Sequence, residues 1–82
     1  MKTFRIVIIE DEPRAARQLQ KLITNSTFSF QVLAVLDSIE ESVSWLETNP
    51  NPDLIFMDIQ LADGLSFEIF HKTEVKATII FT

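Results

Sequence analysis

Carboxylates follow two apolar segments of this chain at the point where each segment ends. Glu10 and Asp11 come directly after the apolar run Phe4–Ile9, and Asp58 comes directly after Leu54–Met57. If the two runs are neighbouring strands of a parallel sheet, they lie about 4.8 Å apart, and ligands bind beyond their carboxyl ends. We therefore expect the three acidic groups to converge on one place.

This acidic pocket predicts a bound metal ion. Converging carboxylates repel, so one of them takes up a proton or a cation lies between them. A hard cation with oxygen ligands suits the site, and Mg²⁺, or Mn²⁺ in its place, is the predicted ion. The expected ligands are Asp11, Asp58 and the backbone carbonyl of Gln60, with Glu10 acting through a water molecule.

The same pocket offers a nucleophile. A carboxyl with an ordinary pKa of about 3.9 is ionised at neutral pH, so Asp58 can attack a phosphorus atom without a general base. A metal ion beside it would offset repulsion from the phosphoryl oxygens. The alternative is structural, because an acid after a strand often caps the next helix, and this is the interpretation that we adopt for Glu12.

Apolar patterning predicts alternating strands and helices that would place these acids. The expected strands are Phe4–Ile9, Phe28–Leu36, Leu54–Met57 and Ala77–Phe81, and the helices begin near Pro13, Ser38 and Ser66, the last one ending at Lys72. The order β-α-β-α-β-α-β favours a parallel, doubly wound α/β sheet with helices on both faces.

Local signals support the first two helices. Pro13 suits a first helical turn, and Ser38 with Glu41 has the spacing of a capping box. Along the first helix an apolar face is expected from residues at helical spacing, which are Ala15, Ala16, Leu19, Leu22 and Ile23.

Composition narrows the class of protein. The 82 residues suffice for one small domain, 46% of them are hydrophobic, and the net charge is −5. An acidic chain with seven Lys and Arg residues does not suit a nucleic-acid surface. Cysteine is absent, so a thiolate metal site is excluded. A helix that crosses a bilayer needs about 20 apolar residues, and the sequence has no such run. No secretory leader is recognisable, and we expect a cytoplasmic protein.

Two segments resemble a known family. IVIIEDEP resembles the opening of response-regulator receiver domains, and LIFMDIQLADG resembles their phosphorylation segment, most closely in regulators with a LytTR-type DNA-binding domain. The resemblance implies a flavodoxin-like sheet of order 2-1-3-4-5 with Asp58 as phosphoacceptor and Glu10 and Asp11 as the acidic pair. It further implies a sensor histidine kinase as donor, an effector domain outside this chain, and dimerisation.

The chain departs from the family pattern in several places. The first acid of the pair is Glu10, and Ala62 stands near a usual proline. Thr82 is either the switch residue or, as we favour, one position before it. The fifth strand, its lysine and the last helices are missing, so residues 1–82 are interpreted as an incomplete receiver domain. We expect poor phosphoacceptance without that lysine, and an uncovered edge at Ala77–Phe81 through which two copies could pair.

Two other functions stay open. A haloacid-dehalogenase-like phosphohydrolase also uses a strand-end aspartate, but it needs a second aspartate two residues on, where this chain has Gln60. A receiver-like interaction module without phosphorylation is the other alternative. The favoured interpretation is a signalling domain and not an enzyme with a separate substrate.

Overall fold

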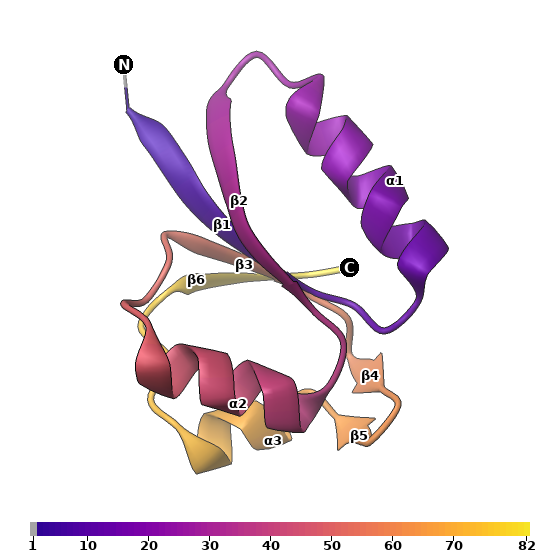
Figure 1. Ribbon diagram of the computed structural model, residues 1–82, viewed down its shortest axis with the longest axis vertical. Coiled ribbons are helices and arrows are strands. Elements are labelled where there is room, and N and C mark those ends of the chain that lie inside the picture. The colour runs from indigo at the N-terminus through magenta and orange to yellow at the C-terminus, as the bar shows by residue number, and fades with distance from the viewer. Residues whose placement is uncertain (1) are drawn as a thin grey trace.

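The computed structural model describes residues 2–82 and contains a parallel sheet with helices on both faces (Figure 1). Its elements are β1 (Thr3–Ile9), α1 (Pro13–Thr24), β2 (Ser29–Leu36), α2 (Ile39–Thr48), β3 (Leu54–Met57), β4 (Gln60–Leu61), β5 (Gly64–Leu65), α3 (Glu68–Lys72) and β6 (Thr78–Phe81). The four long strands are parallel in the order β2-β1-β3-β6. The predicted α/β fold and the order of its first four strands are confirmed, with β6 as the fourth.

The central strand β1 is covered on both faces. Ile6 and Ile8 pack against Ile23 on the side of α1. Val7 and Ile9 point the other way and join a larger core with residues of α2 and α3. These last four side chains of β1 are fully buried, and each such burial contributes about 1.5–3 kcal/mol. The carboxyl end of β1 is therefore firmly placed between its neighbours β2 and β3.

Helix α1 begins as the sequence predicts. Pro13 is its first residue, and the side chain of Glu12 caps it by accepting a hydrogen bond from the Arg14 N–H. The capping role predicted for Glu12 is confirmed. The expected apolar face is wrong at Leu22, which is 67% exposed. Successive helical residues are about 100° apart, so Leu22 points away from the core that its neighbour Ile23 enters.

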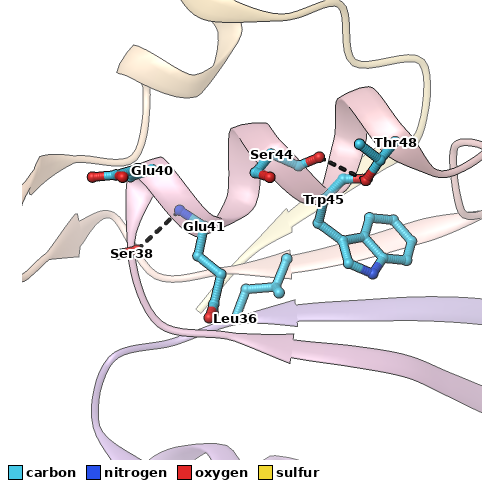
Figure 2. A pocket seen from close by; sticks show the side chains of 7 residues that line it. All are labelled: Leu36, Ser38, Glu40, Glu41, Ser44, Trp45 and Thr48. Carbon is cyan, nitrogen blue, oxygen red and sulfur yellow. Dashed lines mark hydrogen bonds between the residues drawn. The ribbon is translucent and has the colours of Figure 1, made fainter.

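Helix α2 begins at the predicted Ser38 cap, and Glu41 reaches back to the residue before the cap, not to the Ser38 N–H as in a capping box. The Ser38 hydroxyl accepts from the Glu41 N–H at 3.1 Å, and a Glu41 carboxylate oxygen accepts from the Asp37 N–H at 3.0 Å. An open groove of about 530 Å³ lies beside this helix and is lined by Trp45, among other residues (Figure 2). None of the three carboxylates of the predicted site lines it.

The segment after β3 contains two short strands that the sequence analysis does not predict. β4 and β5 form an antiparallel hairpin in which Gln60 lies opposite Leu65. The Ser66 N–H donates to the Ile59 carbonyl at 2.8 Å, so Ser66 belongs to the hairpin ladder. Helix α3 consequently begins at Glu68, two residues after the predicted start.

Strand β6 forms one edge of the sheet, as expected for the fourth strand. Its Ile80 and Phe81 are 40% and 44% exposed, and Phe81 packs edge-on against Phe67 with ring centroids 5.4 Å apart. Within residues 2–82, no helix has the length and apolar character needed to cross a membrane.

Candidate functional site

The structure brings Glu10, Asp11 and Asp58 together. In the pairing of β1 with β3, Ile9 lies opposite Met57, so the residues that follow emerge side by side. The Asp58 N–H donates to the Ile9 carbonyl at 2.9 Å. One carboxylate oxygen from each acid lies within 4.8 Å of those of the other two. The three acids form one cluster at the carboxyl ends of adjacent strands, where β1 and β3 connect to opposite sides of the sheet.

Backbone hydrogen bonds fix the position of Glu10. Its N–H donates to the Leu36 carbonyl at the end of β2 at 2.8 Å. One of its carboxylate oxygens accepts from the Glu12 N–H at 3.2 Å. Glu10 is therefore tied to β2 through its main chain and to the start of α1 through its side chain, while Glu12 itself serves the helix.

The surroundings of Glu10 raise the pKa of its carboxyl group. Burial raises the pKa of the Glu10 carboxyl above its ordinary value, and the charge of Asp58 and hydrogen bonds with Asp58 and Asp11 raise it further, against the lowering effect of the Glu12 N–H. A proton or a cation in the cluster relieves this repulsion. A divalent cation in the cluster would therefore compete with protonation of Glu10.

Basic side chains do not neutralise the cluster within the described part of the chain. The ion pairs found there join Arg5 to Asp53 and Lys76 to Glu74. Asp53 precedes β3 and lies at the opposite end of that strand from Asp58. The negative charge of the three acids is thus left for a ligand to balance.

The oxygen donors at this place fit a hard divalent cation. Mg²⁺ binds through one or two carboxylates and keeps several waters, and Asp11 and Asp58 offer such ligands. The carbonyl of Gln60 is also available. Gln60 and Leu65 form a non-hydrogen-bonded pair, because the adjacent bond joins Ser66 to Ile59, so the ladder does not use the Gln60 carbonyl.

The sequence of the chain is similar to those of known regulatory proteins. No protein-family model matches the chain. The sensory transduction protein LytT of Bacillus anthracis is 32% identical over 65 residues, which are 79% of this chain and 26% of LytT. The phyllosphere-induced regulator PhyR of Methylorubrum extorquens is 41% identical over 61 residues, 74% of this chain and 22% of PhyR. The chain spans about a quarter of the length of these curated relatives.

Solved structures agree with the sequence comparison. The crystal structure of the response regulator PhyR from Brucella abortus has a TM-score of 0.76 and 28% identity, covering 98% of this chain and 33% of that one. The anti-anti-sigma factor PhyR from Bartonella quintana has a TM-score of 0.72 at 27% identity over 99% of this chain. The chain has the sequence and the fold of a response-regulator receiver domain. The resemblance inferred from its two motifs is confirmed.

One further residue of this receiver domain lies near the site through its backbone. The Thr82 N–H donates to the Met57 carbonyl at 3.0 Å, so Thr82 continues β6 beside the strand end that carries Asp58. His71, the single histidine, is exposed on α3. Thr82 therefore comes next to the acidic cluster in the sheet.

Asp63 is a residue that the sequence analysis missed. It lies at the turn of the β4–β5 hairpin, and its carboxylate accepts hydrogen bonds from the first two N–H groups of α2. The sequence already gave α2 a cap in Ser38, so nothing local pointed to a second one. An Asp-Gly pair such as that at 63–64 favours a turn, but it does not show what the turn contacts.

Proposed function

We propose that this chain is the phosphoacceptor domain of a two-component response regulator. The observation that carries the proposal is the position of Asp58. Its carboxylate lies at the end of a core strand, with ligand atoms of Glu10 and Asp11 within 4.8 Å. A carboxylate held beside other acids, at the crevice where ligands bind in such sheets, suits cation-dependent reaction with an anionic phosphoryl group.

The proposed step is an in-line transfer from phosphohistidine. A carboxylate oxygen of Asp58 attacks phosphorus, and the bond between phosphorus and the imidazole nitrogen breaks. The electron pair stays on that nitrogen, which takes up a proton from solvent, and Asp58 becomes an acyl phosphate. A bound Mg²⁺ or Mn²⁺ would neutralise charge on the phosphoryl oxygens. Asp11, Asp58 and the Gln60 carbonyl would hold the ion, and Glu10 would act through water.

The partners follow from the same proposal. The donor is a sensor histidine kinase, and the output is an effector domain outside residues 1–82, which we propose to be a LytTR-type DNA-binding domain that regulates transcription. The similarity to LytT and PhyR supports a regulatory role. The β6 edge, with Ile80 and Phe81 exposed, is the proposed place for pairing of two copies.

Slow phosphorylation of this chain is expected. The ion pairs among residues 2–82 leave the three acids without a basic partner. A positive side chain beside the acceptor would stabilise charge developing on the phosphoryl group. We therefore expect a rate that rises steeply with Mg²⁺ concentration and stays below that of receiver domains that have such a lysine.

Acetyl phosphate with Mg²⁺ tests the proposal. We expect intact-mass and peptide measurements to find one phosphoryl group on Asp58, absent from Asp58→Asn and without Mg²⁺. Asp53→Asn is the matched control, because it removes a carboxylate from the other end of the same strand and leaves an oxygen for the Arg5 N–H. An adduct on Asp58→Asn would contradict the proposal.

The rival functions give different results in the same assay. Repeated turnover of a phosphomonoester would favour a phosphohydrolase. Failure to form an adduct and to bind Mg²⁺ would favour an interaction module.

A further inference from the structure

The hairpin that follows the phosphoacceptor is tied to the start of α2. Asp63 accepts a hydrogen bond from the Ile39 N–H at 2.9 Å through one carboxylate oxygen and from the Glu40 N–H at 3.2 Å through the other. The next N–H, that of Glu41, donates to Ser38 at 3.1 Å. The first three amides of the helix are thus shared between a local cap and a cap that comes from the hairpin.

Both caps satisfy donors that have no partner inside the helix, but they differ in reach. Ser38 is adjacent to α2, whereas Asp63 is 24 residues from Ile39 along the chain. The hydrogen bonds from Ile39, the larger effect, and from Glu40 lower the pKa of the Asp63 carboxyl. Asp63 is therefore ionised at neutral pH and makes charge-assisted contacts.

Close packing at Gly64 is a second link between the hairpin and α2. A Cβ placed on Gly64 would lie 3.1 Å from the Cδ1 of Ile39 and 2.5 Å from a carboxylate oxygen of Glu68. The backbone of the hairpin turn is therefore in direct contact with the first residue of α2. Both links join the turn to Ile39.

The same hairpin carries the proposed metal ligand Gln60. Asp63 is only three positions after Gln60, and the ladder from Ile59 to Ser66 makes the segment one unit. A displacement of the turn therefore moves the Gln60 carbonyl. The position of that carbonyl relative to Asp58 depends on where the turn is held.

We propose that Asp63 is a positioning residue that holds the β4–β5 hairpin on α2 and thereby keeps the Gln60 carbonyl in place for a divalent cation at Asp11 and Asp58. The inference rests on the proposed function for its metal site. Because coupling between two sites is reciprocal, cation binding then also strengthens the capping of α2.

Mn²⁺ binding by the 82-residue chain tests the proposal. Asp63→Ala removes the hairpin cap, and Ser38→Ala removes the local cap of the same helix without touching the hairpin. Removing a residue that orients a metal ligand typically weakens metal affinity by about 10-fold or more. We expect such a loss for Asp63→Ala, a smaller loss for Asp63→Asn, which keeps one acceptor oxygen, and a change below about twofold for Ser38→Ala.

Hydrogen exchange without metal separates this inference from the proposed function. Asp63→Ala should speed exchange of the amides at 60–66, and Ser38→Ala should leave them unchanged. Equal Mn²⁺ affinities in wild type and Asp63→Ala, or equal losses in both alanine variants, would overturn the positioning role. Unchanged exchange in Asp63→Ala would overturn the anchor itself. A wild-type chain that binds no Mn²⁺ but shows the expected exchange would overturn the metal site and retain the anchor.

Discussion

Replacing Gly64 by alanine should destabilise the chain through the hairpin turn. Gly64 has a φ of +141°, a conformation that residues with a Cβ rarely adopt. The new methyl group would also meet Ile39 at 3.1 Å and the carboxylate of Glu68 at 2.5 Å. Two costs therefore arise, one in the backbone and one in packing.

The expected loss of stability follows from these two costs. A residue held in a sparsely populated backbone region costs about 1–3 kcal/mol. The Glu68 carboxylate is the end of a flexible, exposed side chain and can move away, whereas Ile39 is buried and must shift by a few tenths of an ångström. We expect the free energy of unfolding to fall by about 2 kcal/mol, or roughly 10 °C in Tm for a domain of this size.

Urea denaturation of Gly64→Ala, with Gly64→Ala/Glu68→Ala as a second variant, measures the effect. The double variant removes the clash with Glu68 but not the backbone strain, so it should remain about as unstable as the single one. Unchanged stability of Gly64→Ala would refute the backbone argument. Full recovery in the double variant would assign the cost to the side-chain clash instead.

Three further predictions concern buried and charged groups. The Ser66 hydroxyl is fully buried without a hydrogen-bond partner among the described residues, so Ser66→Ala should stabilise the chain by about 1 kcal/mol. Ser42→Ala, which loses the bond to the Ser38 carbonyl, should not stabilise it in the same denaturation assay. The Arg5 N–H and the Arg5 charge lower the pKa of Asp53. The stability that the Asp53 carboxylate gives the folded state is therefore fully present above the ordinary pKa of 3.8 and is lost as the pH falls through the lowered pKa. Urea midpoints between neutral pH and about pH 3 should therefore fall less in Asp53→Asn. The pKa of Glu10 is raised, so ionisation of Glu10 destabilises the folded state as the pH rises above the ordinary pKa of 4.5. Glu10→Gln should therefore be more heat-stable than wild type at neutral pH without cations and should gain less from added Mg²⁺; equal Tm values for the two proteins would contradict this.

The sequence was sufficient to predict the parallel sheet and the convergence of the three acidic side chains. Apolar runs in β1 and β3 indicate buried parallel strands, and this pattern alone places Glu10 and Asp58 at one edge of the sheet. The face that each β1 side chain presents follows from burial, because a slip by one residue would turn Ile6 and Ile8 to the wrong face. These features depend on strong local patterns.

The hairpin and its anchor depend on contacts that no local pattern encodes. β4 and β5 have two residues each, too few to show alternation, and the bond between Ser66 and Ile59 spans the whole loop. The contact of Asp63 with Ile39 joins segments 24 residues apart. Leu22 shows a different kind of error. It is one residue, or about 100° round α1, from the buried Ile23, so the predicted apolar face was too wide.

The central claim is that the three carboxylates form a cation site beside a phosphoacceptor. Beryllofluoride binding tests it most directly. Fluorine NMR of the chain should show a bound beryllofluoride signal that requires both Mg²⁺ and Asp58. The signal should disappear in Asp58→Asn, weaken in Asp11→Asn, and persist in Asp53→Asn. A bound signal that survives in Asp58→Asn, or one that forms equally well without Mg²⁺, would contradict the account.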